Sequence, residues 1–496
     1  MPLAVPNCRT VGNKHEFRFY TFPPFLGAAP RPINAAIKCK MRSVLRLRRF
    51  SAGTLFAWGR SAEKQTGSPS AAAGFEHHGA LTLPFFDDSS VTAVTAGLNS
   101  SGVISCGAPY TFGAGRALGL GAGVRAVDGP RMLRSTRVRS LVLGECTGAA
   151  ISESDAQAFV WGVGTEGQLG FGGAMGPEGS YHGGAQASLV ESPRALAGEP
   201  LAAVALARHR TVLLTTDGVI FCAGSGFHGE LGVGASGVAT APASVIGIYE
   251  PIASVAAGLQ FTLAAARSGT VYFFGNLGYG GTASSNSLRA SSGPIRLEIA
   301  GAAVGAPLII AAGLHHALVS DGSRLWALGA AWDGSGVHSG APREITLPRG
   351  VKRIARVVAG PWTSAIVDGD GRVWIAGRLA SPLLLGGETG PSAARALTEG
   401  RVAAGSATGS AMSSSAGSLA PATAATSAPL SRARLLVDLG LGDEVGAAGG
   451  VDGDGLVVAG GELYAPRLTR VCDVALQGRR VTDLALGAAH ALAVVA

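Results

Sequence analysis

Short apolar and aromatic stretches, each ending in glycine, recur along the chain. Seven have an aromatic residue three positions before the glycine and an eighth is degenerate: Phe56-Ala-Trp-Gly59, Tyr110-Thr-Phe-Gly113, Phe159-Val-Trp-Gly162, Phe221-Cys-Ala-Gly224, Tyr272-Phe-Phe-Gly275, Trp326-Ala-Leu-Gly329, Trp374-Ile-Ala-Gly377 and Val457-Val-Ala-Gly460. Positions two apart lie on the same face of a strand. Each stretch therefore predicts a strand with one bulky face, ended by a glycine in a tight turn.

A second motif, apolar-x-Ala-Gly in its clearest copies, precedes each of these stretches, except that the copy for Phe56 lies near the C-terminus. Its copies are Val94–Gly97, Leu141–Gly144, Val204–Ala207, Val255–Gly258, Ile310–Gly313, Val357–Gly360, Leu439–Gly442 and Leu484–Gly487. The pattern predicts eight units of about 45–60 residues, each made of short strands, which is typical of β-propeller blades. Strands from both termini would share one blade and close the ring.

The segment Gly162-Val-Gly-Thr-Glu-Gly167 matches the G-x-G-x-x-G motif of dinucleotide-binding folds. The same motif recurs in register from Gly224 to Gly229, and no helical pattern follows either copy to build a βαβ unit. Glycine makes up 75 of the 496 residues, which disfavours helices and suits strands joined by turns. We interpret these glycines as turn residues and expect no cofactor.

Positive charge is concentrated at the N-terminus. Residues 1–50 contain ten Lys or Arg and one acid, whereas residues 51–496 contain 30 basic and 31 acidic residues. The near-neutral body argues against direct DNA binding. The segment from Met41 to Ser51 has four arginines, no acid and apolar residues between them, as mitochondrial transit peptides do. A solvated basic tail and a nuclear signal are the alternatives.

The stretches Gly167-Gln-Leu-Gly170, Gly229-Glu-Leu-Gly232 and Ala312–Gly322 resemble the repeat of the regulator of chromosome condensation (RCC1-like) family. The resemblance implies an all-β propeller, usually of seven blades, in which each unit forms one blade. The eighth unit either adds a blade or, with residues 435–465 as the suspect, is incorporated differently. Known members include an exchange factor for the small GTPase Ran and mitochondrial proteins linked to ribosome assembly. The resemblance therefore implies the fold of this chain but not its function.

Candidate sites are few. His316 and His490 occupy the same repeat position, which favours a structural hydrogen bond over catalysis or metal binding. Asp217, Asp321, Asp368 and Asp452 lie at or beside predicted turns, where their side chains can bond nearby backbone donors. Six cysteines without C-x-x-C spacing favour free thiols, with a disulfide framework or a zinc site as the alternatives.

We expect a basic leader over residues 1–50, without order, and one propeller domain over residues 51–496, with insertions at 174–200 and 378–434. The first insertion, with Tyr181 and His182, is the candidate interaction loop. No run predicts a membrane span. These features favour a non-catalytic mitochondrial scaffold for protein partners, ribosomes or RNA–protein complexes. The alternative is a small-GTPase exchange factor in nucleus or cytoplasm.

Overall fold

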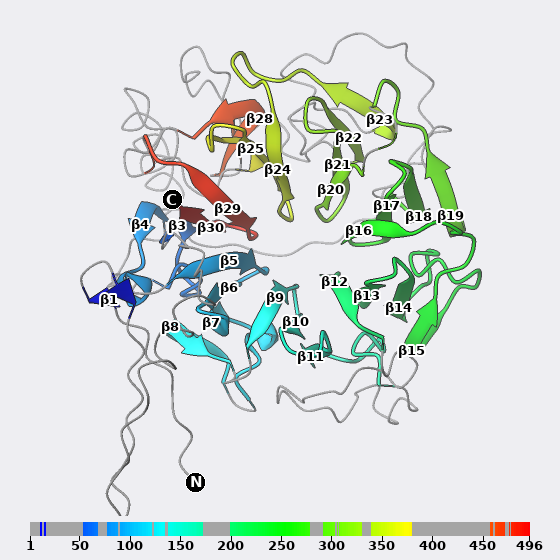
Figure 1. Cartoon of the computed structure of the whole chain (residues 1–496), viewed down its shortest axis with the longest axis horizontal. Helices are drawn as coiled ribbons and strands as arrows, with labels where there is room; N and C mark the ends of the chain where they lie inside the picture. Colours follow the sequence, from blue (N-terminus) through cyan, green and yellow to red (C-terminus); the bar gives the residue numbers. More distant parts are fainter. Residues whose placement is uncertain are drawn as a thin grey trace, which may run out of the picture.

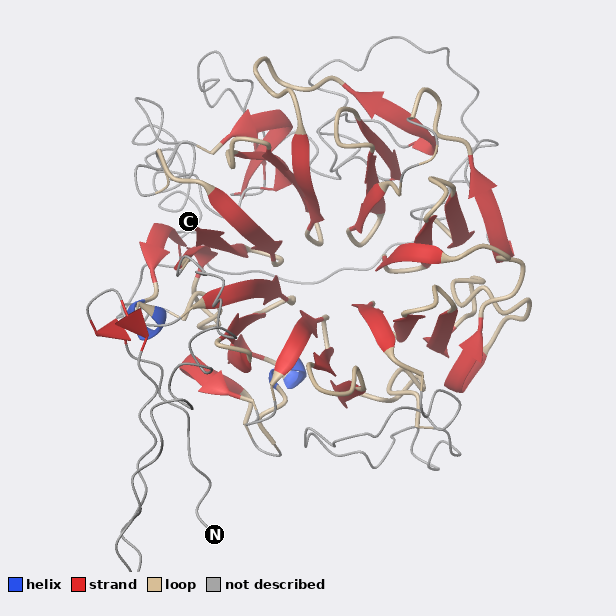
Figure 2. Ribbon diagram, viewed as in Figure 1, coloured by secondary structure: helices blue, strands red, loops and turns tan. Residues whose placement is uncertain are grey.

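The computed structural model describes residues 10–11, 14–15, 53–67, 77–87, 90–121, 124–133, 137–171, 199–277, 291–302, 305, 307–329, 339–378, 457–459, 462–471, 476 and 478–496. Seven antiparallel sheets are arranged radially around a central axis, as Figure 1 shows. Over the described residues, helix is limited to two short 3₁₀ turns, η1 (Pro84–Phe86) and η2 (Arg116–Leu118) (Figure 2). The all-β propeller predicted from the repeat is confirmed, and the ring has seven blades, the number that the family resemblance implied, although eight repeat units are present in the sequence.

Each of the two sequence motifs forms the strand at one radial position of the blades. The apolar-x-Ala-Gly motif supplies the innermost strands, β5 (Val91–Ala96), β9 (Val138–Leu143), β12 (Leu201–Leu206), β16 (Ile252–Ala257), β20 (Ile309–Ala312), β24 (Ile354–Ala359) and β29 (Val481–Leu486). The second strands are β6 (Ser100–Ser105), β10 (Thr147–Ser152), β13 (Arg210–Thr215), β17 (Phe261–Ala266), β21 (His316–Ser320), β25 (Thr363–Asp368) and β30 (His490–Val495). Consecutive innermost strands contact one another around the whole ring.

The aromatic motif supplies the third strand of each blade: β7 (Ala108–Ala114), β11 (Ala158–Gly162), β14 (Ile220–Ser225), β18 (Val271–Gly275), β22 (Leu325–Gly329), β26 (Val373–Arg378) and β3 (Thr54–Arg60). The outer strands are β8 (Ala126–Met132), β15 (Val238–Ser244), β19 (Ser291–Leu297), β23 (Ser339–Ile345), β28 (Glu462–Arg470) and β4 (His77–Thr82). The second blade has three described strands, β9 to β11, and residues 172–198 lie outside the described part.

The eighth repeat copy does not make a blade. Its strand β27 (Val457–Ala459) pairs with β28 at the outer edge of the sixth blade, whose strand order is β24-β25-β26-β28-β27. The suspected pseudo-repeat is thus an addition to an existing sheet. Within residues 1–50 the structure describes only β1 (Thr10–Val11) and β2 (Lys14–His15), which pair with each other.

The termini close the ring as the half-repeats predict. The seventh blade has the order β29-β30-β3-β4, so its two inner strands come from the C-terminal end and its outer two from residues 54–82. Thr54 pairs with Val495 and Gly59 with His490. Because the pairing joins segments far apart in sequence, the closed ring depends on both ends of the chain.

Both faces of each blade are buried, where the sequence analysis expected one bulky face. Seven hydrophobic clusters fill the seven blade-to-blade interfaces. In β21, Ala317 and Val319 pack toward the fourth blade, whereas Leu318 packs toward the sixth. Strands of this kind are buried at every position because successive side chains enter different interfaces.

The repeated glycine of the aromatic motif sits at a bulge in the pairing with the outer strand in six blades. Gly162, in the second blade, has φ of 107° and its added Cβ would lie 2.2 Å from the Cys146 carbonyl oxygen. The glycine is needed because the backbone is left-handed and the neighbouring chain leaves no room for a side chain. The G-x-G-x-x-G match therefore reflects repeat geometry.

Replacing Gly162 with alanine should destabilise the protein by more than about 2 kcal/mol, since both the positive φ and the carbonyl contact oppose a Cβ. Gly129 in β8 is the matched control, because an added Cβ there meets no atom within 4 Å. Its alanine variant should stay within about 0.5 kcal/mol of the wild type. Urea unfolding measures both, and equal losses would contradict this account.

Candidate functional site

The predicted interaction loop, with Tyr181 and His182, lies within residues 172–198, outside the described part of the chain. The second insertion falls largely within residues 379–456, which also lie outside it. Both remain predictions. Among the described residues, the polar groups that could form a site lie at the contacts between blades and in one cleft at the rim.

One repeat position, three residues after the last residue of the apolar-x-Ala-Gly motif, is buried in all seven blades. Its residues are Ser100, Thr147, Arg210, Phe261, His316, Thr363 and His490. Gly313 makes room for the His316 ring, because an added Cβ would lie 2.2 Å from His316 Cε1. Gly487 does the same for His490, at 2.1 Å. In these two blades the glycine is thus explained by the ring that follows it, whereas an added Cβ at Gly97 would lie 2.5 Å from the Gly144 carbonyl oxygen.

In the one blade where alanine, Ala207, replaces that glycine, the buried residue is Arg210. Its guanidinium extends to the fourth blade, where Nη1 donates to Leu259 O at 2.9 Å and Nη2 donates to Gly258 O at 2.7 Å and to Phe261 O. The side chain is 1% exposed, and burial lowers its pKa to about 10. Charge-assisted bonds to three carbonyls hold the two blades together.

His316 makes a comparable bond across the next interface. Its Nε2 lies 3.0 Å from Ser364 Oγ of β25, which confirms a structural hydrogen bond for this residue. Burial, with a smaller effect of the neighbouring His315, lowers the pKa of His316 to about 4. Burial likewise lowers the pKa of His490 to about 4. Both imidazoles are therefore neutral at pH 7 and suited to a packed interior.

A second set of inter-blade bonds explains the Gly-Gln/Glu-Leu-Gly stretches. The buried side chains of Gln168 and Glu230 accept backbone N–H bonds within their own loops. Their carbonyls then accept hydroxyl bonds from the next blade, at 2.6 Å from Thr211 and 2.8 Å from Thr262. Gln65 repeats the arrangement in the seventh blade. These residues tie blades together.

The ring's closing junction is held by Asp483 on β29. Its Oδ1 lies 2.8 Å from Nη1 of Arg356 in the sixth blade, and its Oδ2 accepts a bond from the Val94 N–H in the first blade at 3.1 Å. Burial raises the pKa of Asp483, and Arg356 partly offsets this. One carboxylate thereby joins three consecutive blades.

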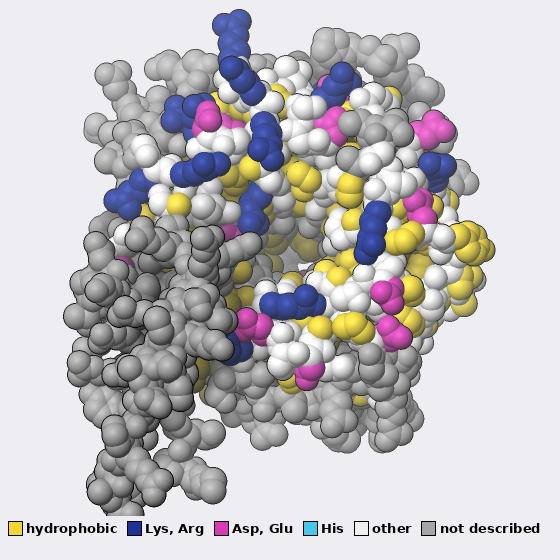
Figure 3. Space-filling model, in the orientation of Figure 1, with side chains coloured by type: hydrophobic (Ala, Val, Ile, Leu, Met, Phe, Trp, Pro, Cys, Tyr) yellow, Lys and Arg dark blue, Asp and Glu magenta, His cyan; other side chains and the backbone are white. Residues whose placement is uncertain are grey.

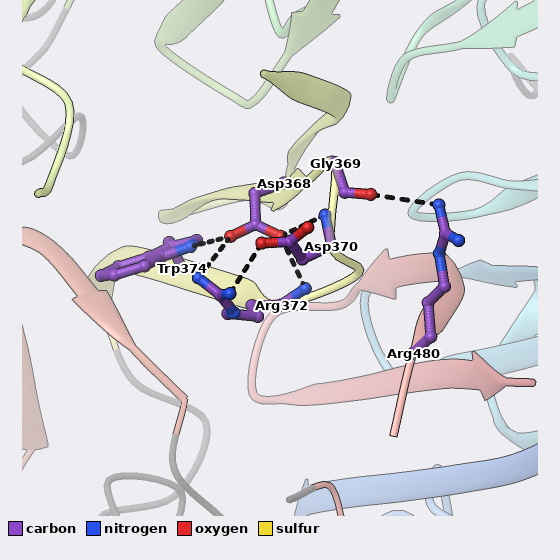
Figure 4. A network of polar contacts seen from close by, with 6 residues as sticks. All are labelled: Asp368, Gly369, Asp370, Arg372, Trp374 and Arg480. Atoms are coloured by element: carbon purple, nitrogen blue, oxygen red, sulfur yellow. Dashed lines mark hydrogen bonds and ion pairs between the residues drawn. The ribbon is translucent and has the colours of Figure 1, made fainter. Parts of the chain in front are cut away.

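The turn between β25 and β26 carries a network of polar contacts, drawn in Figure 4. Asp368 Oδ1 accepts bonds from the Asp370 and Arg372 N–H groups, and its Oδ2 accepts one from Trp374 Nε1 at 3.1 Å. Arg480 reaches across from the seventh blade and donates to Gly369 O at 3.0 Å. The predicted turn role of Asp368 is confirmed.

The structure gives different outcomes for the other three aspartates predicted at turns. Asp321 Oδ1 accepts the N–H groups of Ser323 and Arg324, so its turn role is also confirmed. At the turn containing Asp217, Thr215 Oγ1 accepts the Val219 N–H bond. Asp452 lies outside the described residues.

A cleft of about 500 Å³ opens beside this network, between the sixth and seventh blades. Four arginines line it, Arg372, Arg470, Arg479 and Arg480, with Asp370 as the only acid among the described lining residues. Arg372 is neutralised by Asp370 at 2.6 Å. The Arg479 guanidinium carbon lies 5.3 Å from the Phe56 ring centroid, a cation–π contact that leaves its charge free to act on a ligand.

Further basic residues continue from the cleft along the connection into β24. We define the basic rim as six exposed residues: Arg349, Lys352, Arg353, Arg470, Arg479 and Arg480. Within the described part of the chain, none of them forms an ion pair with a carboxylate. Figure 3 shows dark-blue side chains gathered over β24 and the blade beside it, above the central hollow.

This cleft is not apparent from the sequence, because Arg470 and Arg479 lie outside the two motifs and come together only where β28 meets the segment before β29. Over the described residues, no three His, Cys, Asp or Glu side chains gather as metal ligands would. None of the helices described there is long and apolar enough to cross a membrane. Cys106, Cys146 and Cys222 carry free thiols.

The two buried histidines predict a loss of stability in acid. Their folded pKa values of about 4 lie below the ordinary value of 6.5, so the unfolded chain binds protons first and stability falls as pH drops from 6.5 toward 4. Each contributes up to about 3 kcal/mol to that fall.

A variant with both His316→Gln and His490→Gln should therefore lose less stability than the wild type between pH 7 and pH 4.5. Urea unfolding at the two pH values measures the difference, and the single variants should fall in between. Equal losses in the wild type and the double variant would show that these histidines are not the groups responsible.

Comparison with known proteins gives partial sequence matches, and no family model matches the chain. "Protein RCC2" of Mus musculus is 30% identical over 153 residues, covering 30% of this chain and 27% of RCC2. "RCC1 domain-containing protein RUG3, mitochondrial" of Arabidopsis thaliana is 28% identical over 281 residues, covering 53% of this chain and 59% of RUG3. The chain thus covers less than two thirds of either relative.

Solved structures match the fold over most of the chain. Human WBSCR16 aligns with a TM-score of 0.62 at 16% identity, covering 90% of this chain and 99% of WBSCR16. Prp20p of Saccharomyces cerevisiae aligns with a TM-score of 0.60 at 15% identity, covering 90% and 92%. At these identities the likeness shows the fold. Together with the two-part repeat and the partial sequence matches, the seven-bladed ring shows that the chain has the fold of an RCC1-like propeller.

Proposed function

We propose that this chain is a non-catalytic binding propeller that works in mitochondria, where it holds protein or RNA–protein partners during ribosome assembly or RNA metabolism. Residues 51–496 form its single binding domain. The observation that carries the proposal is the basic rim, whose charges have no carboxylate partner among the described residues. The buried polar groups at the blade interfaces differ in this respect, because they are paired within the protein and stabilise the fold. Charge left on a rigid surface is available to a partner.

The mitochondrial location rests on two further observations. The segment from Met41 to Ser51 has the arginine-rich, acid-free composition of an import signal. The relative RUG3, which matches 53% of this chain, is named as a mitochondrial protein. The leader therefore supports the location that the name of RUG3 gives.

Import can be tested with matched leader variants. Arg46→Ala, Arg48→Ala and Arg49→Ala together should abolish uptake into isolated mitochondria, because they remove charge from the amphipathic segment. Replacing Arg9, Arg18 and Arg31 with alanine removes the same charge outside it and should leave uptake unchanged. Protease protection reports uptake, and proximity labelling of the C-terminally tagged chain identifies its neighbours by mass spectrometry.

Residence of the tagged chain in cytosol or nucleus would overturn the mitochondrial proposal, as would equal loss of import in both sets of variants. If labelling finds neither ribosomal nor RNA-associated neighbours, the proposed role in ribosome assembly or RNA metabolism is rejected.

A small-GTPase exchange factor is the second candidate. The fold similarity to Prp20p favours it, because that protein's structure is described together with binding to Gsp1p and histones. The test is nucleotide release from candidate small GTPases in the presence of the purified chain. Unchanged release rates would reject this alternative.

A further inference from the structure

The cleft between the sixth and seventh blades combines free positive charge with apolar lining residues. Val373, Val471, Leu476 and Val481 line it and belong to the hydrophobic cluster between these blades. The same cleft is lined by Arg470, Arg479 and Arg480, all exposed. The site therefore offers guanidinium groups to an anion and apolar surface to a neighbouring side chain.

The arginines are held at defined places. Arg480 is fixed by its bond to Gly369 O at 3.0 Å, and Arg479 lies over the Phe56 ring. The turn that accepts the Arg480 bond is itself braced by Asp368. Groups positioned before binding lose less conformational entropy when a ligand arrives.

The positive charge of the cleft continues along the connection between β23 and β24. Arg353 lies beside the Asp368–Arg372 turn, where its carbonyl accepts the Gly369 N–H bond at 2.8 Å. With Arg349 and Lys352 it continues the basic rim along the connection into β24. Grouped charges of one sign raise the rate at which an opposite charge is captured.

We infer that this cleft binds an acidic segment of a protein partner, in which Asp or Glu carboxylates meet the arginines and an apolar side chain meets the apolar lining residues. The planar guanidinium matches a carboxylate with two parallel hydrogen bonds. The inference rests on the proposed binding function and names the kind of partner surface.

Two observations favour a protein over a nucleic acid. Proteins that bind single strands stack bases on aromatic side chains, and the described lining residues include no aromatic. Binding a duplex draws on many phosphate contacts, whereas residues 51–496 contain 30 basic and 31 acidic residues. A local cluster of arginines suits a short acidic segment.

The test uses the full chain and a phage-displayed library of random peptides. Selection on the wild type should enrich Asp and Glu together with aliphatic residues. A selected peptide, synthesised with a fluorescent label, should bind at least about tenfold more weakly to the Arg470→Glu and Arg479→Glu double variant, because two attractive charges become repulsive. Replacing the peptide's acids by Asn and Gln should weaken binding similarly, and added salt should weaken the original peptide.

The matched control is the Arg131→Glu and Arg343→Glu double variant. Both arginines are exposed on the outer strands β8 and β23, away from the cleft, so this variant should bind the peptide as the wild type does. Thermal unfolding of both double variants should match the wild type.

Three results would overturn the inference: no enrichment of acidic peptides, equal binding of the selected peptide by the cleft variant, or equal loss in the control. The inference would also be overturned if the Arg470→Glu and Arg479→Glu substitutions abolished the binding of single-stranded RNA and left peptide binding unchanged. Proximity labelling separates the two proposals. If the cleft variant keeps its mitochondrial neighbours, failure of the peptide test concerns the cleft alone.

Discussion

The structure depends on burying both faces of every sheet. Seven hydrophobic clusters lie between blades, and each draws side chains from two neighbours. A single blade would expose two apolar faces to water, so its stability comes from the blades beside it. Only a closed ring gives all seven blades two neighbours. The seventh blade, assembled from both ends of the chain, therefore contributes to the stability of the whole.

Polar groups make this arrangement specific. Apolar packing alone would tolerate sliding between blades, but Arg210, His316 and Asp483 each bond to groups of an adjacent blade. Such buried donors and acceptors are costly unless paired, so they favour one relative placement of the sheets. The structural role that the sequence favoured for His316 is of this kind.

The repeat was readable from the sequence because each blade uses the same positions for the same purpose. Strand identity, the ring closure and the turn roles of Asp321 and Asp368 follow from local patterns. The burial of both faces was not predicted, because the sequence does not show which neighbouring blade a small or aromatic side chain packs against. The eighth copy misled for a related reason: Val457–Ala459 has a strand pattern, and only the pairing with β28 shows that it joins an existing sheet.

The cleft could not be predicted because its charge comes from residues without a repeat pattern. Arg470 ends an outer strand and Arg479 precedes an inner strand of the next blade, so only the packing of two blades brings them together. Blade interfaces use polar groups in a fixed, repeated way, whereas connections between blades are free to vary. It follows that the repeat encodes the rigid ring, and that partner recognition is expected where the repeat is interrupted.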